Sequence, residues 1–377
     1  MFMTSASLFS TYILRLMGKG MPMQIGRSEP RHNNAPYVSV VIPCYNHGRF
    51  VDDAVDSLLK QTWQDFEIII VNDGSTDTET NRFLASYQRP KTRVLNLEKN
   101  VGLPAARNAG IREARGRYIC CLDADDKLQE TYLEKAIIVM EINAGVSFVW
   151  SWTQVFGSES RVWYAPQFDP EQMLFYNLLN PPGVFRRSAW EKVDGFYEAM
   201  RDGFEDWEFW IRLTGYGFRG HRISEKLIQY RREGYSFAQR AAEKKEALFE
   251  QIKTNNPDLY VNPDAIVKKL NRSYRDLYIP APYVNLRRED YIKIPNLARM
   301  IVSSMNSVQT LKWLEKNAPT APLIWVARQA LDEESSDALY ELTPYVYILP
   351  NFIPQYARRE FIEHLQFRHD GISLEAI

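Results

Sequence analysis

The chain has 377 residues, of which 45% are hydrophobic and 25% charged, a globular composition that excludes an intrinsically disordered protein. Its 46 Lys and Arg nearly balance its 47 Asp and Glu, so the overall charge predicts no nucleic-acid partner. The 3 cysteines, two of them adjacent at positions 120 and 121, supply neither a disulfide framework nor metal-ligand spacing, and we expect a reducing, cytoplasmic setting.

The N-terminal segment SLFSTYILRLM is apolar, but Arg15 interrupts it and it has about half the length of a membrane-spanning helix. No basic region precedes it and no clear cleavage site follows it, so a signal peptide is the weaker interpretation. We expect residues 1–35 to form an extension, either an interfacial helix in peripheral contact with the inner face of the plasma membrane or a simple extension of the start.

From Tyr37 the chain alternates between short apolar runs and amphipathic segments. The run YVSVVIPCYN is followed by RFVDDAVDSLLKQT, whose apolar residues recur at helical spacing, and the cycle repeats through FEIIIVNDGSTD, TRVLNLEKN and GRYICCLDADD. Helices are expected near 78–87 and 103–114. Strands of this kind, separated by helices, predict an α/β fold with a mainly parallel sheet covered on both faces, whose ligands gather at the carboxyl ends of the strands.

The second half of the chain is less regular. A helix to about Asn143, the aromatic strand VSFVWSWTQVF and an irregular region to about Glu233 are expected, and a second alternation of strands and helices begins near Leu297. This pattern divides the chain into an extension over 1–35, an α/β unit over 36–256, a helical or irregular linker over 257–296 and a partial Rossmann-like segment over 297–377. We expect that last segment to be truncated or degenerate, with a packing role.

Polar residues follow three of the predicted strands. In VNDGSTD, the residues after Asp73 are ordinary turn formers, and Asp77 is a candidate helix cap, so turn chemistry alone explains the motif. Asp73, however, ends a strand beside Pro43, Tyr45 and Asn46 of PCYN. A carboxylate and an amide at one sheet edge could read the polar edge of a nucleobase or a sugar.

The third strand end, CCLDADD, places Asp123, Asp125 and Asp126 within four residues. Carboxylates this close raise one another's pKa unless a cation compensates. Mg²⁺ and Mn²⁺ take oxygen ligands and often bind one or two carboxylates together with substrate phosphates, so the cluster predicts half of a metal site that a diphosphate completes. The alternative is a solvated turn in which Asp126 caps the next helix.

Two further motifs carry charge at predicted helix starts. In NVGLPAARNAGIREARG, Arg107 lies near a helix N-terminus, where a cation opposes the helix dipole and needs a partner, either a diphosphate or an acidic cluster; the alternative is a solvated side chain. In GFEDWEFWIRL, Glu205, Asp206 and Glu208 fall in a first helical turn. They are either simple capping residues or include a general base beside aromatic walls that raise its pKa.

Taken together and in this order, these motifs resemble the family 2 glycosyltransferases, inverting enzymes with a GT-A type fold. The resemblance implies that Asp73 contacts the base of a nucleotide sugar, usually a UDP-sugar. It implies that Asp123, Ala124 and Asp125 form an Asp-x-Asp motif that handles the ribose and the metal-bound diphosphate, with Asp126 as a further metal ligand. Asp206, of the Glu205-Asp206 pair, would deprotonate the acceptor hydroxyl, and the metal would be Mn²⁺ or Mg²⁺.

Two departures from the family pattern bear on function. Many relatives end the last core strand with Tyr-Arg-x-His, whose His can bind the metal, whereas this chain has YRREGYS and places Glu233 there. Glu233 would either supply an oxygen ligand or mark an altered site. The Gln-x-x-Arg-Trp motif of processive synthases is also absent from the sequence, which favours a distributive transferase.

The sequence therefore predicts a metal-dependent, inverting hexosyl- or N-acetylhexosaminyltransferase. Its partners would be a nucleotide-sugar donor and a glycan or lipid-linked acceptor, in assembly of bacterial surface polysaccharide or glycolipid. A non-catalytic nucleotide-sugar-binding scaffold is the alternative. A sugar nucleotidyltransferase fits less well, because no Gly-rich basic loop follows the first strand. The segment QMLFYNLLNPPGVFRRSAW precedes the predicted base and is expected on the acceptor side.

Overall fold

The computed structural model describes residues 35–143, 145–179, 182–234, 236–263, 297, 299–317, 322–369 and 373–377. The predicted N-terminal membrane contact and most of the predicted linker lie outside these residues. Within the described part of the chain, no helix combines the length and the apolar character needed to cross a bilayer.

The first half of the larger sheet is parallel, as the sequence predicts. Its strands are β1 (Val38–Cys44), β2 (Phe66–Asn72), β3 (Thr92–Asn96) and β4 (Tyr118–Cys121), in the spatial order β3-β2-β1-β4. Helices α2 (Gly48–Leu59), α3 (Thr78–Ala85) and α4 (Leu103–Glu113) connect them. Asp77 caps α3 by accepting a hydrogen bond from the Thr80 amide at 2.8 Å, which confirms the capping prediction.

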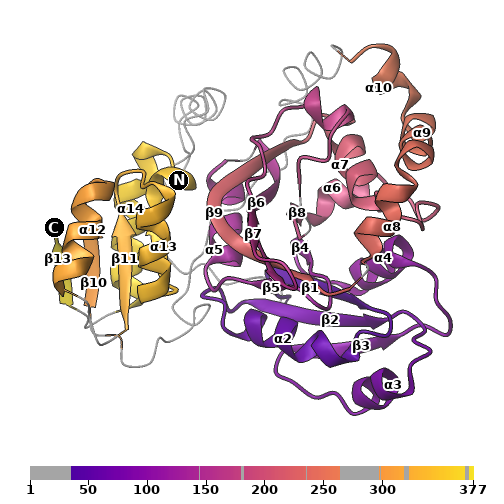
Figure 1. The fold of residues 1–377 in the computed structure, drawn as a ribbon, viewed down its shortest axis with the longest axis horizontal. Coiled ribbons are helices and arrows are strands. Elements are labelled where there is room, and N and C mark those ends of the chain that lie inside the picture. Colours follow the sequence, from indigo (N-terminus) through magenta and orange to yellow (C-terminus); the bar gives the residue numbers. More distant parts are fainter. Residues whose placement is uncertain are drawn as a thin grey trace, which may run out of the picture.

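The second half of this sheet is mixed rather than parallel. Strand β8 (Val184–Arg186) joins β4 antiparallel, and β6 (Val146–Gly157), β9 (Arg219–Arg232) and β5 (Lys127–Leu128) follow in that order, with β7 (Arg161–Trp163) on β6. The long strands β6 and β9 pair in parallel through a register that shifts at three points, where the irregular pairing curves them. Figure 1 shows both curving past β4 and β8.

Two apolar cores lie on opposite faces of the larger sheet. Along β1, Val40 and Ile42 face a core that includes α2 and the helix α5 (Tyr132–Ile142), whereas Val41 faces a core built from α4 and α7 (Glu205–Gly215). The second core also receives α6 (Arg187–Lys192), the short turn η1 (Gln172–Leu174), and helices α8 (Phe237–Glu243), α9 (Lys245–Asn255) and α10 (Pro257–Val261). These helices continue past the predicted boundary at residue 256.

The second alternation forms a separate parallel sheet. Strands β10 (Arg299–Ser303), β11 (Leu323–Ala327), β12 (Val346–Ile348) and β13 (Ser373–Ala376) lie in the order β12-β11-β10-β13. They are connected by α12 (Ser307–Asn317), α13 (Glu333–Leu342), α14 (Arg358–Arg368) and the short turns η3 (Leu349–Asn351) and η4 (Gln355–Ala357). This confirms the prediction of a smaller C-terminal α/β segment.

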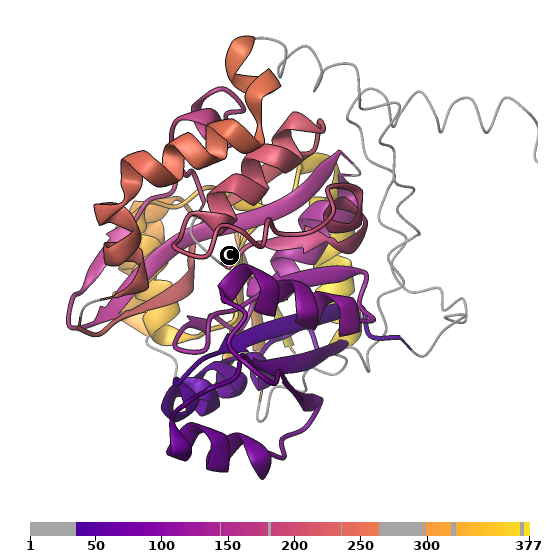
Figure 2. The same cartoon turned by 90° about the vertical axis from the view of Figure 1, so that its right-hand side faces the viewer.

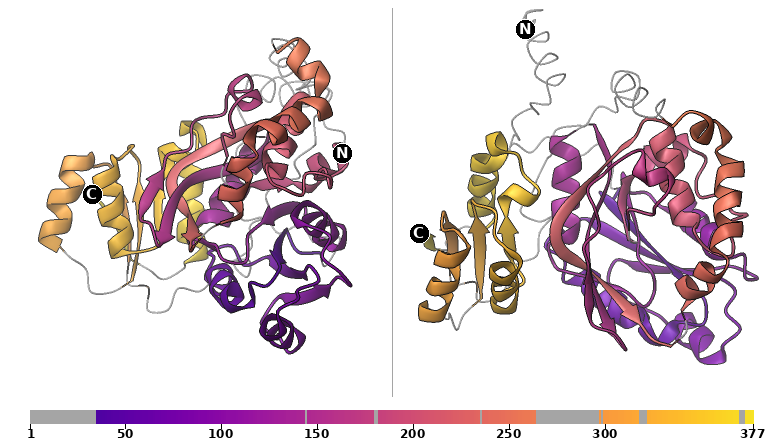
Figure 3. Two further views of the ribbon diagram at one scale, coloured as in Figure 1. Left: turned by 45° about the vertical axis from the view of Figure 1, so that its right-hand side comes forward. Right: turned by 45° about the horizontal axis from the view of Figure 1, so that its top comes forward.

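The smaller sheet packs directly on the larger unit, beside α5 and β9 (Figures 1 and 3). Lys135 of α5 is fully buried, and its ammonium lies 2.8 Å from Glu225 of β9 and donates to the Val346 carbonyl of β12 at 2.8 Å. Its neighbour Glu134 accepts a hydrogen bond from the Tyr347 hydroxyl at 2.8 Å. Figure 2 views the molecule from the right-hand side of Figure 1, with the smaller unit behind the larger one.

Candidate active site

The carboxyl ends of β1, β2 and β4 lie together at one edge of the sheet. Beyond the paired strands, the Asp73 amide donates to the Cys44 carbonyl at 2.9 Å, and the Leu122 amide donates to the Val41 carbonyl at 3.0 Å. The segments that carry Asn46, Asp73 and the acidic cluster therefore leave the sheet side by side, as the α/β pattern predicts.

Asn46 shapes the loop that follows β2. Its backbone is left-handed, with φ at 58°, a conformation that Asn tolerates better than most residues. The side-chain oxygen accepts hydrogen bonds from the Thr76 and Asp77 amides at 2.8 and 2.9 Å, and the amide nitrogen donates to the Thr76 hydroxyl at 3.1 Å. Asn46 thus fixes the end of β1 to the start of α3, while the neighbouring Tyr45 is 42% exposed.

Asp73 holds the loop that leads into α4. Only 3% exposed, it accepts hydrogen bonds from the Val101 amide at 2.7 Å, the Gly102 amide at 3.1 Å and the Asn100 side chain at 3.0 Å. Burial raises the pKa of this carboxyl, although the two backbone amides and Arg201 oppose the shift. The predicted nucleotide-reading residues Asn46 and Asp73 therefore also build the rim of the site.

The structure shows which of the two partners predicted from the sequence Arg107 contacts. Its guanidinium donates to Glu205 at 2.7 Å and to Asp123 at 2.8 Å, and it is only 2% exposed. Burial alone would lower the pKa of Arg107, but the two carboxylates raise it overall, so the charge is retained. The partner of Arg107 in this structure is acidic, and the pairing joins the end of β4 to the start of α7.

The acidic cluster carries negative charge that the protein compensates only in part. Burial, followed by the charge of Asp123, raises the pKa of Asp125, whose carboxylate lies 3.9 Å from a ring nitrogen of His47. Asp126 is 1% exposed; one carboxylate oxygen accepts the Arg231 amide at 2.8 Å, and the other is buried without a hydrogen-bond partner. Burial and the two neighbouring aspartates raise the pKa of Asp126 well above its ordinary value.

These observations fit a cation held partly by the protein. An orphaned carboxylate oxygen and aspartates with raised pKa values are what a site lacking positive charge should show. Among the described residues no three His, Cys, Asp or Glu side chains are grouped closely enough to hold a metal alone. A cation here would therefore depend on oxygen ligands from a substrate, as Mg²⁺ commonly does.

Glu233 lies among arginines. Its carboxylate is 3.4 Å from Arg49 and 3.7 Å from Arg231, and its side chain is 45% exposed. Arg231 also donates to the Asp125 carbonyl at 2.9 Å and pairs with Asp53. The position to which the family resemblance assigns a metal-binding His is thus occupied by a residue whose partners are cationic, and a ligand role for Glu233 stays a prediction.

The two acidic residues that open α7 differ in their surroundings. Glu205 is 4% exposed, and burial and Asp206 raise its pKa to about 7 despite the opposing charge of Arg107. Asp206 is half-buried; burial raises its pKa, while Arg107 and a hydrogen bond from Asn177 at 3.0 Å lower it. Asp206 therefore combines partial access with a raised pKa, which suits a general base.

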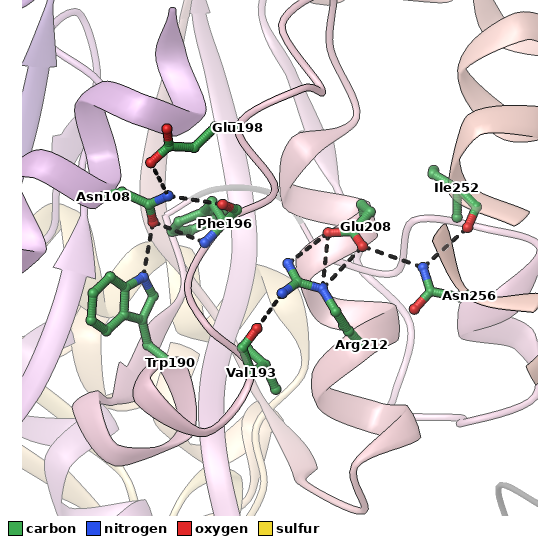
Figure 4. Close-up of polar contacts among 9 residues, drawn as sticks. All are labelled: Asn108, Trp190, Val193, Phe196, Glu198, Glu208, Arg212, Ile252 and Asn256. Carbon is green, nitrogen blue, oxygen red and sulfur yellow. Dashed lines mark hydrogen bonds and ion pairs between the residues drawn. The ribbon is translucent and has the colours of Figure 1, made fainter. Parts of the chain in front are cut away.

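The helix that carries this acidic pair is anchored by polar contacts that no motif predicted (Figure 4). Asn108 of α4 is fully satisfied: its side chain contacts both backbone groups of Phe196 at 2.8 Å, Glu198 at 3.0 Å and the Trp190 indole nitrogen at 3.1 Å. These contacts fix the segment that leads into α7. Asn108 stood next to Arg107 in the motif, but only its partners, over 80 positions away, reveal this role.

A second anchor lies within α7 itself (Figure 4). Glu208 is fully buried and pairs with Arg212 at 2.8 Å, and Arg212 donates to the Val193 carbonyl. Glu208 also accepts a hydrogen bond from Asn256 at 3.3 Å, which ties α7 to the end of α9. The three acidic residues of the predicted turn thus have different roles. Glu208 supports the helix, whereas Glu205 and Asp206 face the acidic strand end.

Residues 39–201 match the family model described as Glycosyl transferase family 2. YwdF of Bacillus subtilis (strain 168), an uncharacterized glycosyltransferase, is 33% identical over 187 residues, which cover 47% of this chain and 68% of YwdF. The chain belongs to glycosyl transferase family 2. It is therefore a glycosyltransferase, and its α/β architecture, with a mixed sheet and helices on both faces, is the GT-A type that the sequence predicted.

A further relative in family 2 is MJ1057 of Methanocaldococcus jannaschii, an uncharacterized glycosyltransferase that is 29% identical over 209 residues, 52% of this chain and 71% of MJ1057. Among solved structures, residues 1–349 of TarS from S. aureus superpose with a TM-score of 0.49 at 20% identity, over 64% of this chain and 72% of that one. TarS has also been solved in complex with UDP-GlcNAc.

Proposed function

We propose that this glycosyltransferase moves a hexose or N-acetylhexosamine from a UDP-sugar to a hydroxyl of a glycan or lipid-linked acceptor, with inversion at the anomeric carbon. The observation that supports it most is the bridge formed by Arg107, whose two ends bind Asp123 and Glu205. This bridge keeps the predicted diphosphate-binding strand end and the predicted base, Asp206, in one site, although they lie far apart in the sequence.

The donor nucleotide would bind at the ends of β1 and β2. Asp73 holds residues 100–102 through two hydrogen bonds to Oδ2 and one to Oδ1, so Oδ1 keeps a lone pair that can accept a hydrogen bond from a base. Tyr45 is exposed enough for its ring to contact the base or the ribose, and Pro43 and Asn46 would contribute to the same pocket. Ala124 and Asp123 would face the ribose.

A divalent cation, Mn²⁺ or Mg²⁺, would be held by Asp125 and Asp123, with Asp126 and Glu233 as further candidates, and would supply positive charge for the departing diphosphate. Arg107 would contribute indirectly, by fixing Asp123. Arg201 is an exposed cation that donates to the Asn100 side chain at 3.3 Å, beside the residues that Asp73 holds, and it is placed to add charge on the nucleotide side.

The reaction would be a single in-line displacement. The acceptor hydroxyl oxygen forms a bond to the anomeric carbon as the bond from that carbon to the diphosphate oxygen breaks. The nucleoside diphosphate leaves with the bonding electron pair, and the hydroxyl proton passes to Asp206. Inversion follows because the attacking oxygen and the leaving group lie on opposite faces of the sugar.

The acceptor would approach along the segment that precedes β8. Asn177 of this segment contacts Asp206, and its neighbours Phe175 and Tyr176 are 48% and 64% exposed. Exposed aromatic rings beside a polar anchor are common in sites that bind amphipathic ligands such as sugars. We place the enzyme at the inner face of the plasma membrane, acting distributively in surface polysaccharide or glycolipid assembly; this setting rests on family analogy.

Substitution of Asp206→Asn tests this function. We expect it to lower turnover by about 100- to 10,000-fold, the usual contribution of a general base, while leaving donor binding intact. Turnover would be measured as UDP release from a panel of UDP-sugars, with water and with glycan acceptors. Donor binding would be measured by thermal unfolding with and without Mn²⁺, where saturation at 100 times the dissociation constant adds about 2.7 kcal/mol.

The matched control is Asp202→Asn in the loop just before α7. Its side chain is 64% exposed and pairs with Lys244 at 3.0 Å, so we expect little change in turnover. Full activity of Asp206→Asn would remove Asp206 as the base. Donor binding without turnover on any acceptor, in the unmodified chain, would instead favour the nucleotide-sugar-binding scaffold.

A further inference from the structure

Asn177 lies between η1 and β8, within the segment QMLFYNLLNPPGVFRRSAW that the sequence places on the acceptor side. Its side-chain nitrogen donates to Asp206 at 3.0 Å, and its side-chain oxygen accepts the Leu179 amide at 3.3 Å. The second contact fixes which way the amide group faces, because a flipped amide would present its NH₂ group to the Leu179 N–H. The side chain is therefore oriented with its N–H towards the carboxylate.

The hydrogen bond from Asn177 matters for Asp206 because of the other groups that surround this carboxylate. The charged side chains that face it are Arg107 from α4, its own neighbour Glu205, and Asp123 from the end of β4. Arg107 commits both terminal nitrogens to the other two carboxylates. Among the described side chains, Asn177 is the hydrogen-bond donor to Asp206, and it engages one carboxylate oxygen, Oδ2.

We propose that Asn177 is a positioning residue that aims the Asp206 carboxylate at the acceptor hydroxyl and favours its charged form. By holding Oδ2, Asn177 leaves Oδ1 to accept the proton. Because Asn177 follows the exposed rings of Phe175 and Tyr176, one short segment would contact the acceptor and orient the base. The role in turnover rests on the proposed function, in which Asp206 is the base.

The first test measures the carboxylate itself and needs no acceptor. In protein labelled with ¹³C at the aspartate carboxyl carbons, the Asp206 resonance would be assigned by its loss in Asp206→Asn and then titrated in wild type, Asn177→Leu and Asn177→Asp. Loss of a donor to the charged form should raise the pKa of Asp206 by about one unit in Asn177→Leu. Asn177→Asp is nearly isosteric and adds a like charge, so its shift should be larger.

The matched control is Asn351→Leu, which also removes a half-buried Asn, one that donates to the Ser224 carbonyl at 3.3 Å and lies on the smaller unit. It should leave the Asp206 titration unchanged. An unchanged pKa of Asp206 in either Asn177 variant that unfolds at the wild-type temperature would overturn the proposal. Asn177→Asp keeps the size of the side chain and decides the matter if Asn177→Leu fails to fold.

The second test follows UDP release from the UDP-sugar panel against pH. A base must be ionised to act, so activity is lost as pH falls through its pKa, and the acid limb should move to higher pH by about one unit in Asn177→Leu. If Asp206→Asn is inactive but the acid limb does not move in Asn177→Leu, the proposed role of Asn177 is wrong while the proposed function stands. If Asp206→Asn is active, the proposed function fails, and the ¹³C titration still judges the contact.

Discussion

Arg107 is the residue on which the two halves of the site depend. It is 2% exposed and neutralises two carboxylates that come from different elements, at 2.7 and 2.8 Å. A buried charge that loses its partner is far costlier than a solvated one, because it keeps its desolvation penalty without the attraction. The arrangement therefore makes Arg107 a structural requirement of the site as well as an electrostatic one.

Substitution of Arg107→Met should lower the free energy of unfolding by about 3–5 kcal/mol, since the buried Glu205 and the partly buried Asp123 would be left without their cation. Chemical denaturation at pH 7 would measure the loss. The control is Arg112→Met on the same helix, whose partner Glu198 lies at 2.9 Å with both side chains well exposed; that pair should be worth less than about 1 kcal/mol. Equal losses of stability in the two variants would contradict this role of Arg107.

Sequence patterns point to the charged residues of the candidate site more readily than to the neutral ones. Asp123, Asp125 and Asp206 stand out because clustered carboxylates at a strand end or a helix start have few structural explanations. Asn177 and Asn108 do not stand out, because a single Asn is compatible with any loop or helix. Their roles come from partners 29 and up to 90 positions away, and such convergence exists only in the folded chain.

At the scale of elements, the parallel strands were predictable because both of their faces are buried. All seven residues of β1 and of β2 are buried, which gives the continuous apolar runs seen in the sequence. Strand β9 was hidden in the predicted irregular region, since RGHRISEKLIQYRR is mostly polar and half-buried. Its partner β6 lies more than 60 positions earlier, so no local pattern marks the pairing.

Helix α5 shows how one element serves both sheets. All of its residues are buried, including Glu134 and Lys135, so it cannot show the polar face of an ordinary surface helix. Burial lowers the pKa of Lys135, while Glu225 opposes the shift. The ion pair therefore lies between two apolar layers, where each charge depends on the other.

Substitution of Lys135→Met should lower the free energy of unfolding by about 3 kcal/mol, because Glu225 would remain buried and unpaired. Adding Glu225→Gln should recover part of the loss, and denaturant titration of the single and double variants measures both steps. Lys226→Met is the control, since its partners Glu333 and Asp337 are each 46% exposed and can be solvated when left alone. A Lys135→Met variant as stable as this control would show that the buried pair contributes nothing.

At the scale of the whole molecule, the candidate site contains carboxyl groups whose charged forms are unfavourable in the folded protein. The pKa values of Asp73, Asp125, Asp126, Glu205 and Asp206 are all raised, chiefly by burial. At these five groups the folded state therefore holds more protons than the unfolded state at mildly acid pH. These groups contribute stability below their unfolded pKa values, and that stability is lost as pH rises through the folded values.

In the ligand-free protein these carboxyls should favour pH 5 over pH 8, by up to about 3 kcal/mol from a carboxyl shifted as far as that of Glu205, whereas His221, His364 and His369, whose pKa values burial lowers, act in the opposite direction. Denaturant titrations across this range would measure the difference. Mn²⁺ together with UDP should reduce the destabilisation at pH 8 by stabilising the charged carboxylates, and Asp125→Asn should remove the effect of the metal. A Glu205→Gln variant with the same change in stability between pH 5 and pH 8 as the wild type would contradict this contribution of the site carboxyls.

The packing of the smaller sheet on α5 has a consequence for anyone who recombines family members. A graft that transplants residues 36–261 alone, or exchanges the C-terminal segment for that of a relative, would separate Lys135 from the Val346 carbonyl and Glu134 from Tyr347. It would also expose the apolar side of α5, and exposed apolar surface of this kind promotes aggregation. Helix α5 and the smaller sheet therefore form one structural unit in this enzyme. A chimera should exchange the helix together with the sheet that covers it.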